Sequence, residues 1–129
     1  MCGICGFNWE DKYLIKKMTE VIYHRGPDKE GFFVGDGISL GNRRLSIIDL
    51  SEKGTQPIYN EDKSICITYN GEIYNFQEIK RKLKDKGHRF VSNTDTEVVV
   101  HAYEEYGPGC LEEFNGMFSF ALWDSKRKR

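Results

Sequence analysis

The stretch Met117-Phe118-Ser119-Phe120-Ala121-Leu122-Trp123-Asp124 decides how the fold is interpreted. Its residues alternate as in a β-strand, with Phe118, Phe120 and Leu122 on one face. The other face is also largely apolar, which is typical of a strand that is covered on both sides. The sequence therefore predicts a sheet that lies inside the molecule.

Helical patterns lie upstream of this strand. Leu14, Ile15 and Met18 belong to an apolar repeat at helical spacing. Two further helices begin at pairs with the spacing of a capping box, Asn75 with Glu78 and Thr94 with Glu97. The predicted helices cover residues 12–24, ended by Gly26-Pro27; residues from 75, ended by Gly87; and residues from 94, ended by Gly107-Pro108.

Short β-like runs cover residues 31–34 and 38–41, with turn signals at 35–37 between them. Another run, 64–69, leads into Asn70-Gly71, which predicts a turn because both residues tolerate positive φ. Strands and helices follow one another without regular βαβ alternation. We therefore expect an α+β fold with helices layered on antiparallel sheet.

The bulk composition excludes several classes of protein. A chain of 129 residues is about one domain. The net charge of −1 gives no general attraction to nucleic acid or to an anionic membrane, and the basic run 126–129 is expected to be a solvated turn. No apolar run reaches the roughly 18 to 20 residues of a membrane span, and the N-terminus lacks the basic region followed by an apolar stretch that is typical of an export signal. We expect a cytoplasmic protein with reduced thiols.

Cys2 is the first candidate for chemistry. Removal of Met1 would make it the first residue, with a thiol and a free α-amine together. Such an amine titrates at about 7.7 to 8.0, so near neutral pH it can accept a proton from the thiol and later donate one to a leaving amine. A nucleophile activated by its own terminal amine is an established arrangement. The alternative is an arbitrary residue in a loosely held terminus.

A thiolate that attacks an amide needs donors for the oxyanion and charges that hold the substrate. Asn70-Gly71 offers a side-chain amide and a backbone N–H, although this pair is often only a turn. The Arg44 guanidinium could bind a carboxylate, or lie on the surface. The Asp95 carboxylate could accept from an ammonium group, or only stabilise the helix dipole.

Two other interpretations come from the same residues. Cys2-Gly3-Ile4-Cys5 has the spacing of half a metal or redox site, but no second pair follows and Cys66 and Cys110 stand alone. A redox pair of the thioredoxin type would follow a strand and open a helix. The chain could also be a non-catalytic module for ligand sensing or interaction, because a retained Met1 would leave an amide in place of the base.

Several motifs in order give a stronger indication. They are Met1-Cys2-Gly3-Ile4, His24-Arg25-Gly26-Pro27-Asp28, Arg44-Leu45-Ser46-Ile47-Ile48-Asp49, Gln56-Pro57, Asn70-Gly71-Glu72-Ile73-Tyr74-Asn75, Thr94-Asp95-Thr96-Glu97 and residues 115–124. Together they closely resemble the glutaminase domain of glutamine-hydrolysing asparagine synthetases. That family belongs to the class II, or N-terminal-nucleophile, glutamine amidotransferases.

The resemblance implies an αββα sandwich of antiparallel sheets covered by helices. It implies hydrolysis of L-glutamine, with Cys2 as nucleophile and Asn70 and Gly71 as the oxyanion hole. It further assigns Arg44 to the α-carboxylate and Asp95 to the α-ammonium group. The remaining substrate contacts would come from Leu45, Ile47, Ile48 and Glu72.

The resemblance also implies a domain organisation. Residues 1–129 would be the N-terminal part of the amidotransferase domain, with the last strands and an ATP-dependent synthetase domain absent. The glutaminase step needs no metal or organic cofactor, whereas ATP and Mg would belong to the synthetase domain. The expected partners are L-glutamine, that synthetase domain and, in a homodimer, a second copy of the chain.

Overall fold

The computed structural model describes residues 2–129 and contains two three-stranded antiparallel sheets. Met1, whose removal the terminal nucleophile requires, lies outside the described residues. The strands are, in spatial order, β1 (Gly3–Phe7), β3 (Ile38–Arg44) and β2 (Lys29–Gly35) in one sheet and β4 (Ile58–Tyr59), β5 (Ile65–Ile73) and β6 (Gly116–Asp124) in the other. The helices are α1 (Lys12–Val21), α2 (Phe76–Asp85) and α3 (Asp95–Tyr106), with 3-10 turns η1 (Tyr23–Arg25), η2 (Glu52–Gly54) and η3 (Gly107–Glu113).

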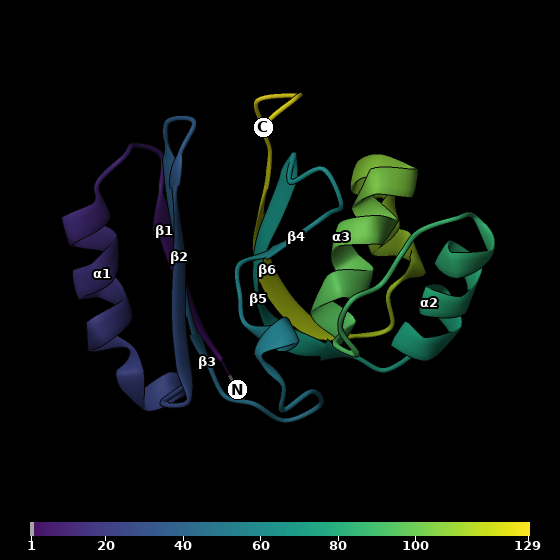
Figure 1. The fold of residues 1–129 in the computed structure, drawn as a ribbon, viewed down its shortest axis with the longest axis horizontal. Helices are drawn as coiled ribbons and strands as arrows, with labels where there is room; N and C mark the ends of the chain where they lie inside the picture. Colours follow the sequence, from purple (N-terminus) through teal and green to yellow (C-terminus); the bar gives the residue numbers. More distant parts are fainter. Residues whose placement is uncertain (1) are drawn as a thin grey trace.

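Figure 1 shows these elements in four layers, with α1 outside the first sheet and α2 and α3 outside the second. The two sheets face each other, so the α+β interpretation and the αββα sandwich are confirmed. β6 is the strand predicted from 117–124, and β5 lies between it and β4. Among residues 2–129 no helix is both long and apolar enough to cross a bilayer.

The first helix is shorter than predicted. Asp11 caps its start by accepting from Leu14 N at 2.8 Å, but α1 ends at Val21. The chain then tightens into η1, where Arg25 N donates to Ile22 O and Gly26 N donates to Tyr23 O. This tightening brings Gly26 against the backbone of β3, where a Cβ atom would overlap Arg43 O.

The hairpin of β2 and β3 confirms the turn predicted at 35–37. Asp36 and Gly37 both have positive φ, 56° and 80°, as a two-residue hairpin turn requires. Both strands extend beyond the predicted runs, to Lys29 and to Arg44. The longer β3 carries Arg44 to the end of its sheet.

The turn predicted at Asn70-Gly71 is wrong. Both residues continue β5, where Asn70 pairs with Ser119 and Gly71 with Phe118 of β6. Pairing along the whole length of β6 keeps this segment extended. Gly71 is needed for another reason, since a Cβ atom there would lie 2.5 Å from the Cα atom of Phe118.

The two predicted capping boxes have different outcomes. Asn75 is the N-cap residue of α2, but its side chain bonds to Glu113 O and Asn115 N instead of to the helix. Thr94 caps α3 as predicted, by accepting from Glu97 N at 3.3 Å. The C-terminal glycines are confirmed, because Gly87 and Gly107 have φ of 100° and 60°.

The main hydrophobic core lies between the second sheet and the helices α2 and α3. It consists of Ile58, Ile65, Ile67, Tyr69, Ile73, Ile79, Leu83, Val98, Val99, Val100, Ala102, Tyr103 and Cys110. On the α1 side Ile15 is fully buried beside buried Thr19 and Ser39, whereas the buried side chain of Leu40 points from β3 toward the second sheet. The second sheet and its helices therefore form the better-packed half of the molecule.

Candidate active site

A cavity lies where the ends of both sheets meet the start of α3. Its walls come from the residue before β1, the end of β3 and the loop after it, the middle of β5, and the first turn of α3. The lining residues are Cys2, Arg44, Leu45, Ile47, Ile48, Asp49, Gly54, Gln56, Tyr69, Gly71, Glu72, Thr94, Asp95 and Thr96. The layered fold thus brings the candidate nucleophile and both candidate charges to one cavity.

The thiol of Cys2 is half-buried beside the backbone of Leu45. Leu45 N lies 3.4 Å from Cys2 Sγ and donates to it, and the thiol lies 3.8 Å from Leu45 O. The next residue, Gly3, pairs with Arg43 of β3. Because β1 is held along β3, the predicted nucleophile is positioned at the cavity by the first sheet.

Arg44 is 4% exposed and ends β3. Its guanidinium donates to Ser51 O at 2.9 Å and to Asp49 O, both in the loop that follows. Gly54 leaves room for this group, since a Cβ atom there would overlap the guanidinium. No carboxylate among residues 2–129 forms a salt bridge with Arg44. A buried cation bonded only to neutral carbonyl groups favours an anionic ligand.

Asp95 is 4% exposed and opens α3. Its Oδ2 atom accepts from Tyr69 Oη at 2.7 Å and from Ile73 N at 3.0 Å. Its place in the first turn of α3 also lets the carboxylate stabilise the helix dipole. Binding of an ammonium group and stabilisation of the dipole are therefore compatible functions of Asp95. Burial and the neighbouring Asp95 carboxylate raise the pKa of Tyr69 above its ordinary value. The phenol therefore stays protonated and keeps donating to Asp95.

One edge of β5 presents backbone N–H groups to the cavity. Tyr74 N donates to Asn115 O, and Ser125 N donates to Ser64 O. The even-numbered residues of β5 are therefore the ones whose backbone groups bond to β6. Odd-numbered residues point their N–H groups the other way. Tyr69 N donates to Gln56 Oε1 at 2.6 Å, and Ile73 N donates to Asp95. The N–H of Gly71 lies between them and faces the cavity.

Leu45, Ile47, Ile48 and Glu72 line the cavity as the resemblance implies, but Asn70 is not among the lining residues. Strand alternation turns its side chain away from the face of Tyr69 and Gly71, toward the first sheet. Its Oδ1 atom is buried without a hydrogen-bond partner within residues 2–129. An unpaired buried amide oxygen is unusual in a folded protein.

The sequence reasoning missed several lining residues, and Gln56 is the clearest. Its Oε1 atom accepts from Tyr69 N and from Asn42 Nδ2 at 3.1 Å, which links β5 to β3 across the sheets. The sequence points to the motif Gln56-Pro57 only through the resemblance. Tyr69 was also missed, although it immediately precedes Asn70 on the same strand.

The two cysteines of Cys2-Gly3-Ile4-Cys5 have different neighbours. A Cβ atom on Gly41 would lie 3.0 Å from Cys5 Sγ and 3.1 Å from Ile15, so the thiol of Cys5 faces α1. The thiol of Cys2 lies beside Leu45 at the cavity instead. Burial, and then the charge of Glu30, raise the pKa of Cys5 to about 11. This arrangement does not favour a metal or redox pair.

Comparison with known proteins gives one matching family and many relatives. The family described as "Glutamine amidotransferase domain" matches residues 1–129. Asparagine synthetase [glutamine-hydrolyzing] 1 of Bacillus subtilis is 42% identical over 132 residues, which covers 96% of this chain and 21% of the relative. A putative asparagine synthetase [glutamine-hydrolyzing] 2 of Methanocaldococcus jannaschii is 43% identical, with 98% of this chain and 28% of the relative covered. The chain thus spans between about a fifth and just over a quarter of the length of these relatives.

A solved structure shows the same fold. The glutamine phosphoribosylpyrophosphate (PRPP) amidotransferase from B. subtilis, complexed with ADP and GMP, superposes with a TM-score of 0.79. The match covers 97% of this chain and 35% of that one at 17% sequence identity. At this identity the likeness supports the fold alone, and it agrees with the four layers described above.

Proposed function

The chain belongs to the glutamine amidotransferase domain family, and from that premise we propose that it hydrolyses L-glutamine to glutamate and ammonia through a γ-glutamyl thioester on Cys2. The observation that carries the proposal is the cavity shared by Cys2, Arg44 and Asp95. These residues are far apart in the sequence. A thiol, a buried cation and a buried anion around one cavity are what an amide-bearing α-amino acid requires.

The two charges fit the two ends of the amino-acid backbone. The α-carboxylate of glutamine binds the Arg44 guanidinium, which among residues 2–129 has only carbonyl oxygens as acceptors. The α-ammonium group binds Asp95, whose two hydrogen bonds within residues 2–129 both reach Oδ2 and leave Oδ1 for the ligand. The side-chain amide then extends toward Cys2. Leu45, Ile47, Ile48 and Glu72 complete the walls.

The reaction requires that Met1 has been removed. The α-amine of Cys2 accepts the thiol proton, and the thiolate attacks the side-chain carbonyl of glutamine. The N–H of Gly71 donates to the oxyanion, together with the Asn70 amide after its side chain has moved to the bound substrate. The α-ammonium group of Cys2 then donates its proton to the amide nitrogen of the substrate. This nitrogen departs as ammonia, and the γ-glutamyl thioester remains on Cys2. Water, deprotonated by the same amine, releases glutamate and restores the thiol.

The relatives at about 40% identity are named for the glutamine-hydrolysing synthesis of asparagine. The proposed use of the ammonia is therefore an ATP-dependent amidation of the asparagine-synthetase type in a separate synthetase domain. ATP and Mg belong to that domain. The glutaminase step uses only the side chains and backbone groups described above. We expect it to take place in the cytoplasm, where thiols are reduced.

The test compares glutamate release from glutamine by the wild type, Cys2→Ala and Cys5→Ala. Intact-mass measurement first establishes that Met1 is absent from each sample. We expect release by the wild type and by Cys5→Ala, and none by Cys2→Ala. An electrophilic glutamine analogue should add one equivalent to the wild type at Cys2. Equal release by the wild type and Cys2→Ala would refute the proposal, and an inert, correctly processed wild type would favour a non-catalytic module.

A further inference from the structure

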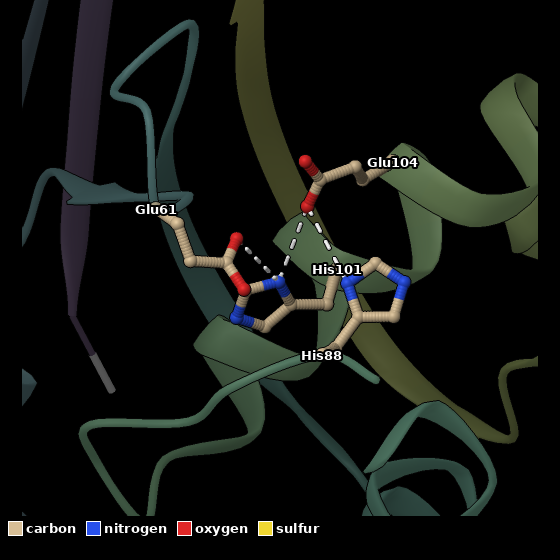
Figure 2. A group of neighbouring side chains, drawn as sticks. All are labelled: Glu61, His88, His101 and Glu104. Carbon is tan, nitrogen blue, oxygen red and sulfur yellow. Dashed lines mark hydrogen bonds and ion pairs between the residues drawn. The ribbon is translucent and has the colours of Figure 1, made fainter. Parts of the chain in front are cut away.

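Four side chains outside the cavity converge at one point beside α3, near the turn between β4 and β5. They are Glu61 in the turn after β4, His88 in the loop after α2, and His101 and Glu104 on α3. One ligand atom from each lies within 4.8 Å of all the others. Figure 2 shows both imidazole rings and both carboxylates pointing toward one another.

The separations between the inward-facing atoms are close to those of a metal site. Glu104 Oε2 lies 3.3 Å from His101 Nδ1 and 3.5 Å from His88 Nδ1. Glu61 Oε2 lies 3.7 Å from His101 Nδ1. Ligand bonds of about 2.0 to 2.1 Å in a tetrahedron place neighbouring ligand atoms roughly 3.3 to 3.4 Å apart. The remaining pairs of ligand atoms lie within 4.8 Å of one another, so contractions of between a few tenths of an ångström and about 1.5 Å would complete the coordination.

The outward-facing atom of each carboxylate is held by another group. Glu61 Oε1 accepts from Arg89 N at 3.1 Å, and Glu104 Oε1 accepts from Asn60 Nδ2 at 3.0 Å. These bonds use one oxygen of each carboxylate. The other oxygen, Oε2 in both, is therefore directed at the convergence point.

Each histidine turns its second nitrogen to a carboxylate. His101 Nε2 lies 3.7 Å from Glu97 Oε1, and His88 Nε2 lies 3.2 Å from Glu105 Oε2. A carboxylate hydrogen-bonded to the far nitrogen of an imidazole is the usual support of a metal-ligating histidine, and His88 has such a bond to Glu105. His101 is 1% exposed, and its Nε2 atom has no hydrogen-bond partner among residues 2–129. The ring orientations thus leave Nδ1 of both histidines for a cation.

The backbone at this cluster is fixed by local structure. His101 and Glu104 are three residues apart on one face of α3. α2 ends in a Schellman motif, in which Gly87 N donates to Lys84 O and His88 N donates to Leu83 O. The positive φ of Gly87 therefore places His88 over α3. A neighbouring cavity lined by Glu61 and His101 gives an ion access from solvent.

We propose that Glu61, His88, His101 and Glu104 form a structural binding site for a divalent transition-metal ion, with Zn²⁺ as the preferred occupant. Two imidazole nitrogens and two carboxylate oxygens are ordinary zinc ligands. The two carboxylates balance the charge of a divalent cation. The ion would join the β4–β5 turn, the loop after α2 and the middle of α3, which are otherwise joined here by the ion pairs and hydrogen bonds described above.

The test titrates chelator-treated protein with ZnCl₂ by calorimetry and measures thermal unfolding with and without the metal. We expect one equivalent bound and a higher Tm with Zn²⁺. Loss of a group that only hydrogen-bonds to a metal ligand lowers metal affinity roughly 10- to 100-fold. Because His88→Gln and Glu61→Gln each remove a ligand itself, each should weaken Zn²⁺ binding at least about tenfold. Both side chains reach solvent, so both variants should fold. Binding of Co²⁺ should give the intense visible absorption of tetrahedral coordination.

Matched controls separate this site from other ligands. His24→Gln removes an exposed histidine of η1 and should leave Zn²⁺ binding unchanged. A Cys2→Ala/Cys5→Ser double variant should also bind one equivalent, which separates the cluster from the thiols. Failure of the wild type to bind Zn²⁺, unchanged affinity in both ligand variants, or loss of binding in the cysteine variant would each overturn the proposal. None of these measurements depends on glutaminase activity.

Discussion

Tyr69→Phe tests how the candidate substrate-binding carboxylate is held. The substitution removes only the hydroxyl that donates to Asp95 Oδ2 at 2.7 Å, between side chains that are 2% and 4% exposed. A hydrogen bond to a charged group contributes about 1.5 to 3 kcal/mol, and removing it leaves the carboxylate with one donor among residues 2–129, Ile73 N. For a chain of this size 1 kcal/mol corresponds to about 4 °C, so Tm should fall by about 6 to 12 °C.

The kinetic expectation for this variant follows from the same bond. A carboxylate with one donor is less firmly oriented toward the α-ammonium group, so KM for glutamine should rise while kcat changes little. Circular dichroism gives Tm and a glutamate-release assay gives KM. Tyr74→Phe is the control, because that ring is 54% exposed and its loss of a hydroxyl should shift stability by under about 0.5 kcal/mol. If Tyr69→Phe matches this control in both Tm and KM, the hydrogen bond does not position Asp95.

Three further outcomes are expected. Gly71→Ala should destabilise the protein by about 1 to 3 kcal/mol in urea unfolding through overpacking against Phe118, whereas Gly109→Ala, with no atom within 4 Å of the new Cβ, should be neutral or slightly stabilising. Hydrogen bonds from Ser51 and the backbone of Asn93 lower the pKa of Asp49 to about 2. The stabilisation that these bonds give to the folded state is present above about pH 4 and is lost as pH falls toward 2. The free energy of unfolding of Asp49→Asn should therefore fall less steeply over this range than that of the wild type. Parallel plots of this free energy against pH would contradict the assignment. Burial raises the pKa of Cys66 to about 12 and of Cys110 to about 11, so alkylation at pH 8 followed by peptide mass spectrometry should find both unmodified.

The sequence predicted the elements whose signals are local. The alternation in 117–124, the Asp36-Gly37 hairpin and the Thr94 cap all depend on neighbouring residues, and all are present. The turn predicted at Asn70-Gly71 was wrong because the turn propensity of these residues is local. Their extended conformation comes from pairing with β6, which lies more than 40 residues further along the chain. The capping box predicted at Asn75 is absent for the same reason, since the Asn75 side chain bonds to residues 113 and 115 instead of to the helix.

The candidate sites follow the same division. Cys2, Arg44 and Asp95 were identified from motifs and do line one cavity. Gln56 was missed because its function is to accept from Tyr69 N across the sheets, and no spacing in the chain reveals that contact. The cluster that we propose as a metal site was missed because its four side chains come from three segments, and only His101 and Glu104 are close in sequence.

The uneven packing of the two halves has a consequence for motion. Most of the buried apolar side chains belong to the layer of β4, β5, β6, α2 and α3, while Cys2 is attached to the thinner layer that α1 covers. Amide hydrogens of α1 should therefore exchange with solvent sooner than those of α3. A ligand that contacts Cys2 and Asp95 at once would tether the two layers, and would slow exchange in α1 without touching that helix.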